Sequence, residues 1–138
     1  MATDSEGRPR PDPTPAALPF WEALARDELL LPLCRLCGTW VFYPRRRCSS
    51  CLSDDLEWLP VEPVGEIYAF SVSPRPTAPM FAADVPQVLA VVELPIGVRM
   101  TTTLVADDAA SLRVGLPVVG VFDHGDDGRT LLRFRPAS

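Results

Sequence analysis

The chain has 138 residues and a net charge of −5, with 47% hydrophobic and 22% charged residues, a composition typical of one soluble globular domain or two very small ones. Its longest aliphatic run, residues 88–92, is far shorter than the ~20 apolar residues of a membrane span. The N-terminus lacks the apolar segment of a secretory signal, so we expect a protein of the reducing cytoplasm without membrane association. The negative charge disfavours general binding to nucleic acids.

The N-terminal segment alternates proline with polar residues and contains no aromatic residue. Such a composition cannot bury enough surface to offset the entropy lost on ordering, so we expect residues 1–17 to form a flexible tail. Further along, residues 28–33 are too apolar for a loop. Because Pro32 disfavours a helix there, this run predicts an edge strand that leads to the first cysteine.

A short amphipathic helix is predicted between the tail and this strand, over residues 18–27. Pro19 suits the first turn of a helix because its fixed φ matches helical backbone. Phe20, Trp21 and Leu24 follow at spacings of three and four residues, which place them on one helical face. These three side chains are candidates for contact with a partner protein, or for packing against the rest of this chain.

The strongest chemical signal is the arrangement of the four cysteines. Cys34 and Cys37 form one C-x-x-C pair, and Cys48 and Cys51 form a second pair after ten further residues. Each pair can present two sulfurs from one tight turn, and two such knuckles supply the four thiolates of a tetrahedral metal site. Gly38 follows the first pair, where the knuckle needs backbone that tolerates a positive φ.

The second pair is followed by Leu52 instead of glycine. Zinc is the favoured ion for this ligand set, although iron in a rubredoxin-like site uses the same four ligands. The alternative of disulfides or spare buried thiols is less favoured, because the spacing is paired and no secretory signal is present. A closed four-sulfur site leaves no open coordination position, so the predicted metal builds structure and does not catalyse.

Arginines surround this cluster. Arg45, Arg46 and Arg47 lie between the two cysteine pairs, and Arg35 lies inside the first. Their forked guanidinium groups suit contacts with phosphate or with an acidic partner. Equally, they can balance the negative charge that four thiolates leave on a zinc ion. The sequence leaves both interpretations open.

From residue 61 onward the hydrophobic pattern changes to a period of two, which indicates strands. We expect strands over residues 64–73, 87–94, 98–105, 117–122 and 130–134, and one helical turn within 107–112. There is no room for crossover helices between them. Residues 61–138 are therefore predicted to form a small, closed or nearly closed antiparallel barrel whose strands meander.

Residues suited to catalysis are scarce. If the cysteines bind metal, no thiol remains as a nucleophile, and His124 is the only histidine. It falls in a loop of aspartates and glycines, where a solvated hairpin residue is expected. No glycine-rich phosphate loop or dinucleotide motif is present. These features argue against an independent enzyme and favour a role in binding or assembly.

Several motifs together carry a resemblance to a known family. They are Phe20-Trp21, Cys34-Arg35-Leu36-Cys37-Gly38, Phe42-Tyr43-Pro44-Arg45, Cys48-x-x-Cys51, Trp58, Gly65-Glu66-Ile67-Tyr68, Val114-Gly115 and Phe134-Arg135-Pro136. Over residues 18–136 the chain resembles small prokaryotic proteins that join a rubredoxin-like zinc ribbon to an OB-fold. The resemblance implies a mainly β protein, with a helix and ribbon in residues 18–60, an OB-fold barrel in 61–138, and one structural zinc ion on the four cysteines.

The same resemblance implies a function. Members of that family are non-catalytic partners of thiolase-like enzymes, including thiolases, aldolases and acyltransferases that act on acyl-CoA or related thioesters. We therefore expect an accessory subunit in a hetero-oligomer. Its candidate docking residues are Phe20, Trp21 and Leu24 on the helix, and Met80 and Phe81 in the proline-rich stretch between two strands.

Two alternatives remain at this point. The chain could bind an acyl-CoA or acyl-carrier group directly, with Arg45, Arg46 and Arg47 contacting phosphates. It could also bind single-stranded nucleic acid, since zinc ribbons and OB-folds serve that purpose elsewhere. Nucleic-acid binding ranks last, because residues 61–138 contain six arginines against nine acidic residues.

Overall fold

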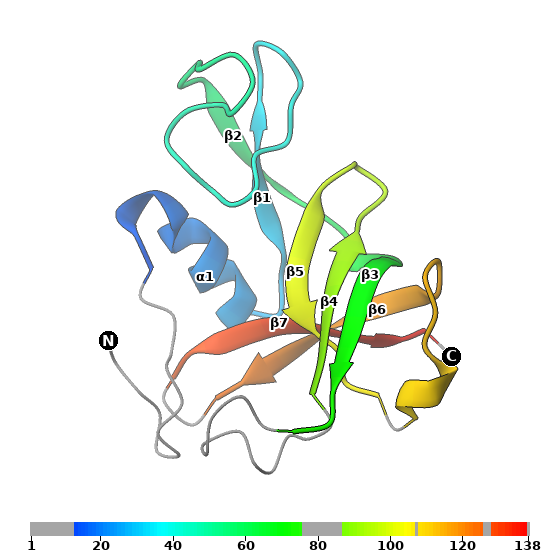
Figure 1. The fold of residues 1–138 in the computed structure, drawn as a ribbon. Helices are drawn as coiled ribbons and strands as arrows, with labels where there is room; N and C mark the ends of the chain where they lie inside the picture. The colour runs from blue at the N-terminus through cyan, green and yellow to red at the C-terminus, as the bar shows by residue number, and fades with distance from the viewer. Residues whose placement is uncertain (1–12, 76–86, 107, 126–127, 138) are drawn as a thin grey trace.

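The computed structural model describes residues 13–75, 87–106, 108–125 and 128–137. It consists of one short helix, a two-stranded sheet and a five-stranded antiparallel barrel (Figure 1). The elements are η1 (Pro15–Ala17), α1 (Leu18–Ala25), β1 (Leu30–Cys34), β2 (Leu56–Pro60), β3 (Val64–Ser73), β4 (Gln87–Glu93), β5 (Arg99–Thr103), η3 (Ala109–Ser111), β6 (Pro117–His124) and β7 (Thr130–Pro136). No helix within these ranges is long and apolar enough to cross a bilayer.

The N-terminal helix forms as predicted, with Pro19 in its first turn, although it ends at Ala25 and not near Asp27. The prediction of a flexible tail over residues 1–17 is wrong at the C-terminal end of this range, because Pro15–Ala17 forms a 3₁₀ turn and Ala17 is fully buried. Residues 1–12 lie outside the described part of the chain.

A two-stranded sheet carries the cysteine-containing loops. Its first strand, β1, matches the edge strand predicted over residues 28–33, whereas its partner β2 lies in a segment for which the sequence predicts no strand. The two strands pair antiparallel from Leu30 opposite Pro60 to Cys34 opposite Leu56. Pro32 is tolerated in this strand since both strands of a two-stranded sheet are edges. Its carbonyl still accepts a hydrogen bond from the backbone N–H of Val41, at 2.9 Å.

The five barrel strands form near the predicted positions, but they do not follow a simple meander. Their order is β5-β4-β3-β6-β7, so β6 returns to pair with β3 on the opposite side from β4. The barrel closes through a parallel bridge between Leu104 and Phe134, where the Val105 N–H donates to the Phe134 carbonyl at 2.8 Å. Five strands closed in this Greek-key order are the OB-fold architecture.

Strand β3 belongs to both halves of the barrel and bends sharply. Its first three residues pair with β6, and its residues from Glu66 onward pair with β4, with a bulge between Ile67 and Ala69. The bulge interrupts the predicted alternation, so that Ile67 and Phe70 both contact the core. Gly65 permits the close approach of β4, since a Cβ at this position would lie 2.4 Å from the Glu93 carbonyl oxygen.

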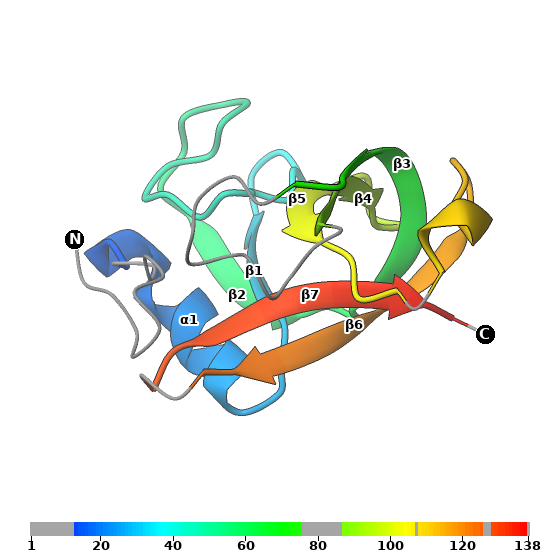
Figure 2. The same ribbon diagram turned by 60° about the horizontal axis from the view of Figure 1, so that its bottom comes forward.

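Helix α1 joins the ribbon to the barrel. It contacts β1 on one side and strands β6 and β7 on the other, as Figure 2 shows from below the barrel. One hydrophobic core extends through all of these elements. It includes Phe20 and Leu24 from α1, Leu31 from β1, and Val92 and Phe134 from the barrel.

A polar contact also fastens the end of α1 to the barrel. His124, expected to be a solvated loop residue, lies at the end of β6 with Nε2 at 2.6 Å from Asp27 Oδ1. Its Nδ1 lies 2.9 Å from the hydroxyl of Thr130, which is buried. Asp27 adopts the left-handed conformation, with a φ of 60°, that turns the chain out of the helix.

We expect His124→Ala to lower the free energy of unfolding by about 1–2 kcal/mol, because it removes both hydrogen bonds and leaves the Thr130 hydroxyl without this partner. Urea denaturation of the purified chain measures the difference. Glu22→Ala, at an exposed position of α1, is the control and should change stability by less than about 0.5 kcal/mol. Equal losses in the two variants would show that the histidine contact carries no stability.

Candidate metal centre

The four cysteines lie on two knuckles of similar backbone geometry. In the first, the Gly38 N–H donates to the Cys34 carbonyl at 2.9 Å, and in the second, the Leu52 N–H donates to the Cys48 carbonyl at 3.0 Å. Gly38 has a φ of 79° and Leu52 a φ of 65°, so the leucine adopts the conformation for which glycine is favoured. The two chain segments therefore build equivalent turns despite their different sequences.

The knuckles bring all four sulfurs together. Cys34 Sγ lies 3.6 Å from Cys51 Sγ, Cys37 Sγ lies 3.5 Å from Cys48 Sγ, and all four atoms lie within 4.8 Å of one another. A disulfide needs sulfurs about 2.05 Å apart, so these thiols are free. A tetrahedral zinc ion with Zn–S distances of about 2.3 Å places its ligands about 3.8 Å apart. The donor atoms and their spacing therefore fit one zinc ion.

The surroundings of the sulfurs shift the pKa values of the cysteines in opposite directions. The hydroxyl and backbone of Thr39 lower the pKa of Cys37 to about 6, so this residue is a thiolate at neutral pH. A backbone hydrogen bond at Ser53 lowers the pKa of Cys51, but desolvation and the neighbouring thiols outweigh it and raise the pKa to about 12. Zinc binding must therefore displace a proton from Cys51, as metal binding to thiols generally does.

The arginines predicted near the metal are exposed. Arg45, Arg46 and Arg47 lie on the loop between the knuckles, where Arg47 Nη1 donates to the Leu52 carbonyl at 3.2 Å. Arg35 pairs with Asp55 through its Nε at 2.9 Å. The assignment of Arg45–Arg47 to a phosphate or an acidic partner stays a prediction.

The structure corrects part of the predicted docking surface. Phe20 and Leu24 are buried in the chain's own core, because the apolar face of α1 packs on β1 and the barrel, so they are not an exposed contact surface. Trp21 is partly buried at the edge of this core and donates from Nε1 to the Tyr43 hydroxyl at 2.8 Å. Met80 and Phe81 lie outside the described residues.

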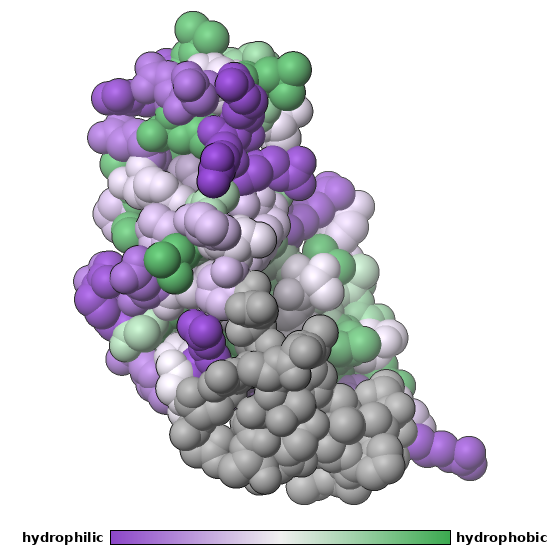
Figure 3. All heavy atoms as spheres, turned by 90° about the vertical axis from the view of Figure 1, so that its left-hand side faces the viewer, coloured by the Kyte–Doolittle hydropathy of each residue, from purple (hydrophilic) through white to green (hydrophobic). Residues whose placement is uncertain are grey.

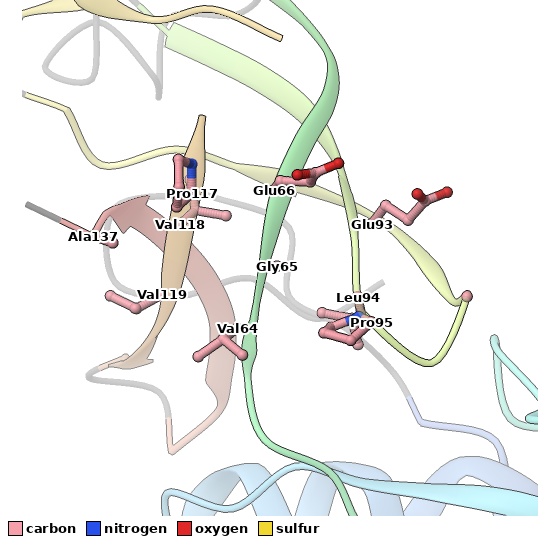
Figure 4. A pocket seen from close by; sticks show the side chains of 11 residues that line it. Val64, Gly65, Glu66, Glu93, Leu94, Pro95, Pro117, Val118, Val119 and Ala137 are labelled. Atoms are coloured by element: carbon pink, nitrogen blue, oxygen red, sulfur yellow. The ribbon is translucent and has the colours of Figure 1, made fainter. Parts of the chain in front are cut away.

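Among the residues that the structure describes, two of the cavities lie beside the β4–β5 turn. One, of about 550 Å³, lies between the start of β3, the β4–β5 turn and the start of β6. Figure 4 shows the carboxylates of the paired residues Glu66 and Glu93 at one end of it and apolar side chains at the other. The second, of about 490 Å³, lies between the ribbon and the β4–β5 turn, lined in part by Trp40 and Arg99. Neither contains Arg45–Arg47, so these arginines do not form a phosphate site with either cavity.

Sequence reasoning missed the most exposed apolar side chains near the metal. Leu36, between the first two ligands, and Leu52, after the fourth, project from the knuckles into solvent. Their positions beside the ligands were visible in the sequence. Only the turn geometry shows that neither side chain folds back onto the core.

A four-cysteine ribbon followed by a closed five-stranded barrel defines a protein of the zinc-ribbon and OB-fold class. Family models agree with this architecture: residues 21–57 match the rubredoxin-like zinc ribbon domain of ChsH2, and residues 58–123 match the C-terminal OB-fold domain of ChsH2. The chain belongs to this family, which confirms the resemblance, the fold class and the structural zinc predicted from the sequence.

Comparison with relatives of known sequence supports the same family assignment. The chain is 34% identical over 119 residues to a probable enoyl-CoA hydratase alpha subunit from Thermomonospora curvata, which covers 86% of this chain but only 37% of that protein. It is 33% identical over 103 residues to a DUF35 domain-containing scaffold protein from Methanocaldococcus jannaschii, covering 69% of this chain and 70% of that one.

Two of the solved structures that share the fold cover most of this chain. One is a chain of an Ltp2-ChsH2(DUF35) aldolase, with a TM-score of 0.83 and 32% identity over 94% of this chain and all of that one. The other is a DUF35-family protein of unknown function from Sulfolobus solfataricus, with a TM-score of 0.61 and 14% identity over 88% of this chain and 85% of that one. The second comparison supports the fold alone.

Proposed function

We propose that this protein is a non-catalytic accessory subunit that binds and supports a thiolase-like enzyme acting on acyl-CoA or related thioesters. The observation that carries the proposal is the match, over the whole length of the matched chain, to a structure described as an Ltp2-ChsH2(DUF35) aldolase. A relative described as a scaffold protein is consistent with the same role.

The chemistry of the described residues supports a role without catalysis. The four thiols are committed to a closed metal site, which leaves no position for water or substrate. Both ring nitrogens of His124 are engaged, by Asp27 and by Thr130. The histidine therefore fastens the helix to the barrel and is not poised against a nucleophile in a cavity.

Copurification tests the proposal directly. A tagged full-length chain, expressed in its native host, should retain an enzyme of the thiolase superfamily, identified by mass spectrometry. The two proteins should migrate as one hetero-oligomer in size-exclusion chromatography with light scattering. The isolated partner should lose stability or acyl-CoA activity that adding this chain restores.

Two results would overturn the proposal. The first is turnover of an acyl-CoA thioester by the purified chain alone. The second is a chain that remains monomeric and retains no thiolase-like enzyme. Calorimetry with CoA thioesters separates the alternative role, because micromolar binding by the isolated chain would indicate a direct acyl-CoA module. The geometry does not favour this alternative in the form predicted, since Arg45, Arg46 and Arg47 line neither cavity.

A further inference from the structure

The end of the zinc ribbon exposes two leucines beside the metal ligands. Leu36 is 72% exposed and Leu52 is 68% exposed, the highest values for any large hydrophobic side chain in the part of the chain that the structure describes. Figure 3 shows hydrophobic side chains among hydrophilic ones at this end of the molecule. Both leucines sit on the turns that carry the cysteines, and their side chains project into solvent.

Leu52 is also conformationally unfavourable. Its φ of 65° is the left-handed conformation that disfavours residues with a side chain, and the equivalent residue of the first knuckle is Gly38. Burial does not compensate for the unfavourable backbone conformation of Leu52, because its side chain is exposed. The turn does not require leucine either, because glycine builds the same turn at Gly38. An unfavourable residue without an internal benefit points to a contact outside the chain.

The charge around these leucines is distinct from that of the rest of the chain. Residues 34–55 contain four arginines and two acidic residues, Asp54 and Asp55, and Asp55 pairs with Arg35, whereas the chain as a whole has a net charge of −5. Arg45 and Arg46 are exposed on the loop between the knuckles. Arg47 bonds the Leu52 carbonyl, which places its guanidinium group beside that leucine. This end of the molecule is therefore apolar at two points and has a net positive charge around them, concentrated on Arg45–Arg47.

We propose that the ribbon tip, formed by Leu36, Leu52 and the exposed arginines Arg45–Arg47, docks onto an acidic surface of the partner enzyme that has apolar recesses for the two leucines. This inference rests on the proposed function and identifies the surface through which it operates. Arginine pairs with carboxylates through two parallel hydrogen bonds, which suits such a surface. An anionic bilayer is less suitable, because the acidic remainder of the chain would face the same extended negative surface.

Two leucine variants test the docking surface on the full-length chain. Leu52→Gly removes the side chain and relieves the unfavourable backbone conformation, and Leu36→Ser removes the other apolar side chain at a largely exposed position. The matched control is Val114→Ser, since Val114 is 65% exposed but lies on the barrel between η3 and β6. Affinity for the copurified thiolase-like subunit is measured by isothermal titration calorimetry, and zinc content and Tm are measured for each variant.

We expect Leu36→Ser and Leu52→Gly each to weaken binding by about tenfold or more, as for apolar side chains buried at an interface. Zinc content should not change, and the Tm of Leu52→Gly should equal or exceed that of the wild type. Val114→Ser should bind within about twofold of the wild type. The double variant Arg45→Ser/Arg46→Ser should associate more slowly and show a weaker dependence on salt.

The outcomes separate the two proposals. If the wild-type chain binds the enzyme and both leucine variants bind equally well, the docking surface is wrong while the accessory role stands. If the wild-type chain binds no thiolase-like subunit, both proposals fail. The wild-type chain can also be tested for binding to phosphatidylcholine vesicles that contain phosphatidylglycerol. If it binds them and the leucine variants do not, the ribbon tip docks onto a membrane and the proposed protein surface is wrong.

Discussion

Replacing Cys34 by serine is expected to abolish metal binding and unfold the ribbon. A hydroxyl is a poor substitute for a thiolate ligand, and structural zinc contributes about 10–16 kcal/mol in small zinc domains. That contribution equals or exceeds the total stability of about 5–15 kcal/mol typical of a native protein. Elemental analysis should find about one zinc ion per wild-type chain and almost none in the variant.

Fluorescence provides a second measurement of the same change. Trp40 and Trp58, in and beside the ribbon, are partly buried against the common core. Their emission should shift toward that of solvated indole when the ribbon unfolds. Ser49→Ala is the control, because Ser49 is exposed within the second knuckle between two ligands. A Cys34→Ser chain that kept its zinc and its Tm would contradict the assignment of the metal centre.

The second large effect is expected at the closure of the barrel. Phe134 is fully buried in β7 and pairs with Leu104, directly after β5, through the parallel bridge that joins the two edges of the five-stranded sheet. Phe134→Ala should lower the free energy of unfolding by about 3–5 kcal/mol, through lost burial and the cavity left behind. For a domain of this size the Tm should fall by roughly 10 °C or more.

Zinc content distinguishes this variant from the cysteine variant. Phe134→Ala should still bind about one zinc ion per chain below its Tm, because the residue lies in the barrel and not among the ligands. Leu131→Ala, on the same strand at an exposed position, should change stability by less than about 1 kcal/mol. An unfolding free energy for Phe134→Ala that matches this control would refute the proposed closure.

Local patterns explain which parts of the structure were predictable. The spacing of Cys34, Cys37, Cys48 and Cys51 indicated the metal site because each knuckle is built from adjacent residues. The barrel strands were predictable for the same reason, since a period of two is visible within each strand. Their order was not, because the return of β6 to β3 depends on a contact between segments far apart in the sequence.

The predictions that were wrong concern features that depend on contacts between distant segments or on weak local patterns. The spacing of Phe20 and Leu24 correctly indicated an apolar helix face, but it could not show whether that face covers this chain or another. Strand β2 was missed because it has only five residues and ends in a proline, so its alternation of apolar and polar residues is too short to stand out after the cysteine loops. The bulge in β3 changes the direction of side chains after Ile67 and leaves no distinct signal in the sequence.

The course of β1 has a consequence for the behaviour of the protein in a cell. This strand carries Leu31, which packs in the core shared with the barrel, and ends at Cys34, one of the predicted metal ligands. Loss of the metal should therefore also disturb the packing of the barrel. A ligand that binds only the native state raises its population by mass action. The abundance of folded protein should therefore follow the supply of free zinc, and starvation for this ion should expose the whole polypeptide to proteolysis, including parts remote from the sulfurs.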